Sequence, residues 1–123
     1  MRTNKKNNND LKRINDGYNH WVLQRISAIL IIPLIFWFLY SILGLMLKTY
    51  NESIEWVINP LNATLLIILL IGIFYHSGMG LQVVIEDYIS NMKYRMVVLN
   101  ISKIVLLSLA IISIISVLKI ILY

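Results

Sequence analysis

The sequence predicts an all-α integral membrane protein with three transmembrane helices. Three long stretches with almost no charged residues support this prediction, together with the overall composition. Of the 123 residues, 59% are hydrophobic and 14% are charged, whereas soluble domains average about 45–50% and about 25%. A water-soluble fold would therefore have too few polar side chains to cover its surface.

The first two apolar stretches, 26–47 and 61–85, contain no charged residue. Each is long enough to cross a hydrocarbon core of about 30 Å as a helix. The third stretch, 96–122, contains Lys103 and Lys119. Two lysine stems can extend in opposite directions and bring both ammonium groups near lipid headgroups, so this stretch also counts as a span. The expected helices cover about 20–48, 60–88 and 95–122.

The distribution of lysine and arginine predicts the orientation. Six basic residues precede the first span, one lies in the first loop beside two glutamates, and Lys93 and Arg95 lie in the second loop. Because positive residues favour the cytoplasmic side, we expect the N-terminus inside and the C-terminus outside, in the inner (cytoplasmic) membrane. Residues 1–19 are polar and basic. We expect them to form a flexible inner tail ahead of a membrane anchor over 20–123.

Two further features of the composition exclude classes of function. The chain has no cysteine, so it cannot form disulfides, thiolate-bound iron–sulfur clusters or a covalently attached c-type haem. Any electron transfer must use a cofactor held by other ligands. The net charge of +5 is concentrated at the inner face, and no basic element with interleaved aromatic residues exists apart from the short N-terminal tail. Nucleic-acid binding is therefore not expected.

His76 lies deep inside the second span. Ionisable side chains at this depth usually face protein, a cavity or a cofactor. The alternative is a neutral histidine that hydrogen-bonds to a neighbouring helix. Gly72 and Gly80 lie one turn before and one turn after it on the same helix face. Such glycines either permit tight helix packing or leave room for a flat ligand, and the histidine between them favours the edge of a haem.

His20 is the only other histidine, and it precedes the first span. A haem b held by two histidines would therefore need its second ligand from another subunit, because His20 lies near the membrane surface. With Arg25 five residues on, His20 suits contact with anionic propionates or phosphates. The alternative is that both residues anchor the helix at the inner interface.

Asp87 and Tyr88 follow the second span at its inner end, about 16 Å along the helix from His76. A carboxylate and a phenol side by side at the membrane boundary can exchange protons and hydrogen-bond a ligand carbonyl. The alternative is a solvated acid beside a tyrosine of the aromatic belt.

Two motifs resemble the small hydrophobic membrane-anchor subunit of succinate dehydrogenase, respiratory complex II. They are His20-Trp21-Val22-Leu23-Gln24-Arg25-Ile26-Ser27-Ala28 and His76-x-x-x-Gly80-x-x-x-x-x-x-Asp87-Tyr88. Motif order, three-helix layout and length agree beyond the first 17 residues. The larger anchor subunit typically has Arg-His after this glycine, whereas Leu81-Gln82 follow Gly80 here. That departure favours the small subunit.

The resemblance implies that His76 is an axial ligand of haem b, shared with a larger cytochrome b anchor subunit that supplies the opposite histidine. It implies that Asp87 and Tyr88 help form the ubiquinone site, with Tyr88 donating to a quinone carbonyl, and that His20 and Arg25 lie near the haem propionates. The chain would pack with its partner anchor and hold an iron–sulfur and a flavoprotein subunit at the lipid bilayer. It would carry no catalytic residue of its own.

Two other functions fit the residues. One is the anchor of a fumarate reductase, which runs the reaction in reverse. The other is a small transporter or scaffold in which His76 and Asp87 relay protons or bind an ion. Transporters usually show internal repeats or broken helices, and this sequence has no repeat.

Overall fold

The computed structural model describes residues 2–123, with side chains described from Lys5 onward. It is entirely helical outside short turns, as the sequence predicts. The elements are α1 (Arg2–Leu45), α2 (Tyr50–Ile58), α3 (Pro60–Tyr88) and α4 (Met92–Leu122). Three of them, α1, α3 and α4, are long and apolar enough to cross a membrane. These helices are those of a multi-pass membrane protein.

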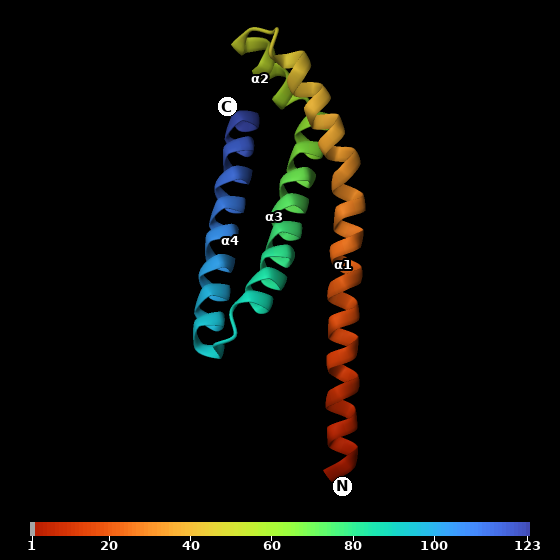
Figure 1. The fold of residues 1–123 in the computed structure, drawn as a ribbon. Coiled ribbons are helices and arrows are strands. Elements are labelled where there is room, and N and C mark those ends of the chain that lie inside the picture. The colour runs from red at the N-terminus through yellow and green to blue at the C-terminus, as the bar shows by residue number, and fades with distance from the viewer. Residues whose placement is uncertain (1) are drawn as a thin grey trace.

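The three long helices run antiparallel to their neighbours, with α3 in the middle (Figure 1). Helix α3 packs against α1 on one side and against α4 on the other. The short helix α2 caps the bundle where α1 ends and α3 begins (Figure 1), and it contacts both α3 and α4. The two chain ends consequently lie at opposite ends of the bundle, as an odd number of crossings requires.

Helix α1 is longer than expected, because it begins at Arg2 instead of near residue 20. The segment interpreted as a flexible tail is therefore helical, and it projects past the ends of α3 and α4 (Figure 1). Extending an existing helix avoids the cost of nucleation, and lysine and arginine are good helix formers. The helix also continues through Pro33, whose side chain is exposed.

Helix α2 was not expected from the sequence. It starts with a capping box, in which the Thr49 side chain accepts from the Glu52 backbone N–H at 3.4 Å and the Glu52 carboxylate accepts from the Thr49 backbone N–H at 2.8 Å. The Glu52 carboxylate accepts hydrogen bonds from the backbone N–H of Thr49 and from its hydroxyl at 2.9 Å, and these two bonds lower the pKa of Glu52. Trp37 of α1 stacks on Trp56 of α2, with ring centroids 5.6 Å apart, which holds α2 against the end of α1.

Small residues set the contact between α1 and α3, which we call the α1–α3 seam. A Cβ added to Gly72 would lie 3.1 Å from Cγ1 of Ile31, and one added to Gly80 would lie 3.7 Å from Nε2 of Gln24. Side chains of α1 thus occupy the space that the two glycines leave. The expectation that both glycines clear a haem edge is therefore corrected at Gly72, which serves close helix packing.

Replacing Gly72 with leucine should destabilise the α1–α3 seam, because Ile31 leaves no room for the added side chain. Overpacking of this kind typically costs about 1–3 kcal/mol, measurable as a lower melting temperature of the purified protein or its complex. Gly17→Leu is the matched control, since nothing lies within 4 Å of a Cβ at Gly17. Equal melting temperatures for the Gly72→Leu and Gly17→Leu proteins would contradict this packing.

Candidate functional site

His76 lies in the middle of α3 and faces α1, where it is half-buried. Its Nδ1 atom is 2.9 Å from Oγ of Ser27 on α1. Ser27 is the most enclosed polar residue of the described chain, with 8% of its surface exposed. One face of α1 carries Gln24, Ser27 and Ile31 at helical spacing. This face of α1 contacts the imidazole from one side, through Ser27.

A second hydrogen bond of Ser27 decides which imidazole nitrogen carries the proton. The Ser27 hydroxyl donates to the backbone carbonyl of Gln24 at 2.8 Å. Because a hydroxyl has one proton, Oγ must then accept from His76, whose Nδ1 is the donor. In a neutral imidazole this leaves Nε2 without a proton and with a free lone pair. Metal-bound histidines are commonly oriented in this way by a hydrogen bond from the other ring nitrogen.

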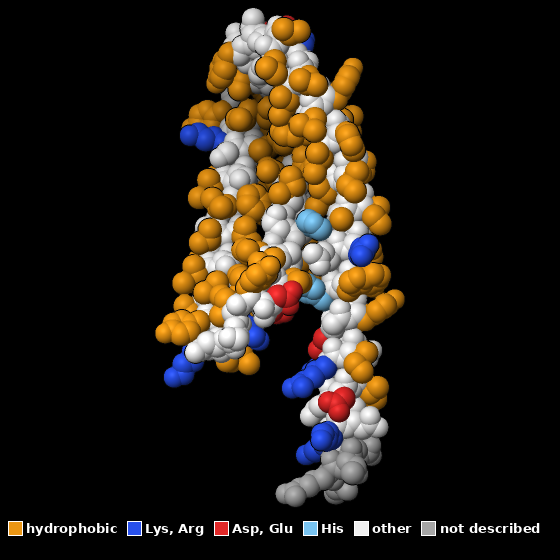
Figure 2. All heavy atoms as spheres, in the orientation of Figure 1, with side chains coloured by type: hydrophobic (Ala, Val, Ile, Leu, Met, Phe, Trp, Pro, Cys, Tyr) orange, Lys and Arg blue, Asp and Glu red, His pale blue; other side chains and the backbone are white. Residues whose placement is uncertain are grey.

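A cavity of about 290 Å³ adjoins His76. It is lined by Trp21, Gln24, Arg25, Ala28 and His76. The Arg25 guanidinium lies 5.0 Å from the centre of the Trp21 ring, a cation–π contact that keeps the positive charge beside the cavity. Both histidines of the chain are visible along the α1–α3 seam in Figure 2. The structure thus brings together two of the predicted site residues, Arg25 and His76.

His20 lies one helical turn before Gln24 on the same face of α1 and is half-buried. Its Nε2 atom is the one buried side-chain nitrogen or oxygen among the described residues that has no hydrogen-bond partner. Buried polar atoms are normally paired, so this unpaired nitrogen is an exception within the described residues. His20 does not line the cavity that Arg25 and His76 share.

Asp87 and Tyr88 form the last residues of α3, away from that cavity. Both are exposed, Tyr88 to 85% of its surface. The turn that follows is fixed by Arg95, whose Nε donates to the carbonyl of Ile89 at 2.8 Å. The structure does not join these two residues to the histidines, and it leaves both side chains free to contact something beyond the chain.

Sequence reasoning assigned no role to Ser27 or Arg95. Ser27 stands within the first motif, and the recurrence of polar residues at positions 20, 24 and 27 along an otherwise apolar helix was the available signal. Arg95 was used only to predict the orientation. Its contact with the turn after α3 depends on how α4 folds back, which no local pattern encodes.

The arrangement offers one oriented imidazole and one nearby cation. Among residues 2–123, no three His, Cys, Asp or Glu side chains gather in a way that could hold a bare metal ion. A metal bound at His76 would therefore need most of its coordination from a prosthetic group and from another subunit. The donor set suits an iron porphyrin better than a free ion, since a porphyrin supplies four nitrogens itself.

Comparison with known proteins identifies the family. The family model described as "Succinate dehydrogenase/Fumarate reductase transmembrane subunit" matches residues 1–117. The chain is 43% identical over 79 residues to the succinate dehydrogenase hydrophobic membrane anchor subunit of Rickettsia bellii, covering 64% of this chain and 63% of that protein. It is 30% identical over 88 residues to the succinate dehydrogenase membrane anchor subunit of Reclinomonas americana, covering 69% and 73%.

The match spans less than two thirds of the Rickettsia bellii protein. No solved structure matches the chain significantly. The family model nevertheless covers both motifs and almost all of the three long helices. The chain therefore belongs to the family of succinate dehydrogenase and fumarate reductase transmembrane subunits.

Proposed function

We propose that this chain is the small membrane-anchor subunit of a succinate dehydrogenase. In this role it binds haem b together with a larger cytochrome b anchor subunit and contributes to the site where ubiquinone is reduced. The observation that carries the proposal is the Ser27–His76 hydrogen bond at 2.9 Å, because it leaves Nε2 of a histidine at mid-helix ready to bind iron.

The residues around His76 fit a haem. The neutral imidazole, oriented by Ser27, has the protonation that an axial ligand needs. The cavity beside it carries the positive charge of Arg25, which suits anionic propionates, and His20, one turn before Gln24 on the same face of α1, lies in their vicinity. When bound, haem b supplies a one-electron redox centre. The partner anchor supplies the opposite histidine.

Tyr88 and Asp87 are the residues we assign to the quinone site. Tyr88 can donate its phenolic proton to a quinone carbonyl, and this hydrogen bond strengthens as negative charge develops on reduction. Asp87 orients Tyr88 or relays protons from water. Their exposure at the end of α3 suits a site that neighbouring subunits complete. Electrons reach this site from an iron–sulfur subunit, since the chain has no cysteine to hold a cluster.

The relatives favour succinate oxidation over the reverse reaction. The family description covers both succinate dehydrogenase and fumarate reductase, whereas the similar proteins of Rickettsia bellii and Reclinomonas americana carry only the first name. The flavoprotein that oxidises succinate and the iron–sulfur subunit would dock at the end of the bundle where α1 projects, which is also the end that bears Tyr88.

The N-terminus should face the cytoplasm and the C-terminus the opposite side of the inner membrane, because the basic residues gather at the N-terminal end and in the first turn of α4. A reporter enzyme fused after Tyr123 should be active only in the outer compartment, and one fused before Met1 only in the cytoplasm. A cytoplasmic signal from the C-terminal fusion would overturn the orientation.

Replacing His76 with leucine should abolish the low-spin haem b spectrum of the purified complex, measured per mole of flavin to separate haem loss from poor assembly. Ser27→Ala should lower haem affinity about 10- to 100-fold, the usual cost of losing an orienting partner of a metal ligand, and Ser27→Thr should restore it. Ser41→Ala is the control, because Ser41 bonds only the Trp37 carbonyl of its own helix. An unchanged low-spin spectrum in the His76→Leu complex would reject ligation.

Tyr88→Phe should slow quinone reduction about tenfold, because a lost hydrogen bond of about 1–2 kcal/mol changes a rate by roughly that factor. Succinate oxidation with a soluble artificial acceptor should stay intact. Tyr94→Phe is the matched control, since Tyr94 is exposed on α4 near the same end of the bundle. If both activities of the Tyr88→Phe complex fell together, Tyr88 would be structural, and if neither changed, the quinone would bind elsewhere.

A further inference from the structure

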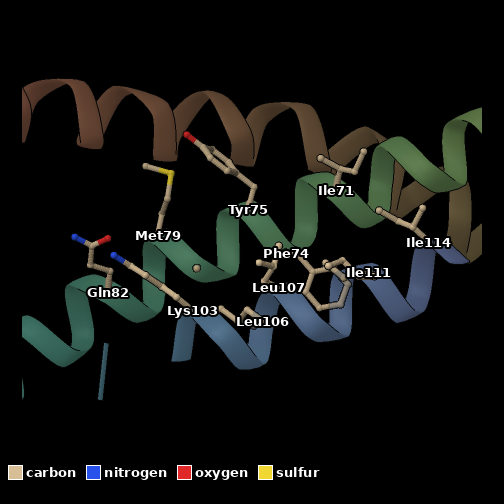
Figure 3. A pocket seen from close by; sticks show the side chains of 12 residues that line it. Ile71, Phe74, Tyr75, Met79, Gln82, Lys103, Leu106, Leu107, Ile111 and Ile114 are labelled. Carbon is tan, nitrogen blue, oxygen red and sulfur yellow. The ribbon is translucent and has the colours of Figure 1, made fainter. Parts of the chain in front are cut away.

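A groove of about 570 Å³ runs between α3 and α4. Figure 3 shows its side chains, which are almost all apolar. The lining residues include Ile71, Tyr75 and Met79 on α3 and Leu107, Ile111 and Ile114 on α4. Gly78 widens the groove because it has no side chain. A Cβ at this position would contact Leu106 at 3.7 Å.

The groove is separate from the site proposed for haem. It shares no lining residue with the cavity beside His76. Gly78 lines the groove and is two residues from His76, which places it about 200° around a helix of 3.6 residues per turn. Met79, which also lines the groove, is three residues from His76 and therefore only about 60° away. The groove thus extends from the far side of α3 to the face beside His76, and the proposed electron-transfer site shares no lining residue with it.

One end of the groove is polar. Lys103 extends along α4 toward Gln82 of α3 (Figure 3), and both line the groove. The Gln82 amide donates to the Glu86 carboxylate at 2.9 Å. Among the described residues, the one ion pair within 4 Å joins Lys48 and Glu52. The Lys103 ammonium therefore has no anionic partner among the described residues, although it borders an apolar groove.

Helix register places Lys103 near the membrane boundary. On one side of α3, Gln24 of α1 lies beside Gly80. On the other side, Lys103 of α4 lines the groove together with Gln82 of α3. Arg25 and Lys103 therefore lie at nearly the same level along α3. From there the groove follows about 11 residues of each helix, from 82 to 71 and from 103 to 114, which is about 16 Å at 1.5 Å per residue. Half of a hydrocarbon core of about 30 Å is about 15 Å. The groove has the length of one leaflet.

We infer that this groove binds an anionic phospholipid, with one acyl chain between α3 and α4 and the phosphate paired with Lys103. The apolar lining matches the chain, and the ammonium at the boundary matches the headgroup charge. The lipid belongs to the leaflet at the end of the bundle where α1 projects. It fills a surface concavity that two straight helices cannot close by themselves, and so stabilises the contact between α3 and α4.

The test uses the intact complex, delipidated in detergent and then reconstituted into vesicles of equal phosphatidylcholine and phosphatidylglycerol. After re-extraction, bound lipid is counted per complex by mass spectrometry. We expect phosphatidylglycerol to be retained preferentially, and Lys103→Gln to reduce its retention at least fivefold relative to phosphatidylcholine. Lys119→Gln is the control, because Lys119 lies on the same helix outside the groove and should leave retention unchanged.

A second pair of variants tests the acyl-chain part of the groove. Ala110 lines it, whereas Ile112 is exposed elsewhere on α4. Ala110→Phe should expel the retained lipid of either headgroup, and Ile112→Phe should not. Equal phosphatidylglycerol retention in the Lys103→Gln and Lys119→Gln complexes would overturn the proposal. Release of the partner anchor subunit by Lys103→Gln or Ala110→Phe would overturn it too, since the groove would then be a protein interface.

Discussion

The hydrogen bond between Ser27 and His76 is the contact on which the arrangement of this chain depends. It joins two antiparallel helices, from Ser27 near the start of the first apolar stretch to His76 within the second, where an unpaired polar group is costly. It fixes the register of α1 against α3, and with it the positions of Gln24 against Gly80 and of Ile31 against Gly72. The same bond orients the imidazole beside the cavity that Arg25 borders, so that one contact serves both helix packing and the proposed haem site.

Few of the residues whose side chains the structure describes are buried. The buried apolar side chains are Ile31, Ala63, Leu69, Met79, Ile85 and Val117. Most large apolar residues are exposed on the helix surfaces instead. In a bilayer this carries little penalty, because lipid tails are as apolar as leucine and association relies on close packing and polar contacts. In the α1–α3 seam, the small residues allow the close packing and the Ser27–His76 hydrogen bond is the polar contact.

The cavity beside His76 and the groove between α3 and α4 differ in chemistry, and this difference follows from which helices form them. The cavity beside His76 lies on the α1–α3 seam, where the polar face of α1 contributes Gln24 and Arg25. The groove between α3 and α4 is lined by side chains of two almost wholly apolar helices and is polar only at Lys103 and Gln82. One hollow therefore suits a charged, flat cofactor edge, and the other suits an acyl chain.

The sequence by itself determined the helical class, the three spans and the bounds of α3, because charge-free stretches of this length have few stable alternatives in a membrane. It also singled out His76, since an ionisable residue at mid-span is rare. Only the tertiary structure decided that Gly72 packs against Ile31, that Ser27 accepts a hydrogen bond from Nδ1 of His76, and that Lys103 lies at one end of a groove between α3 and α4. Each of these depends on the rotation and register of one helix against another, which long-range packing sets and no local pattern contains.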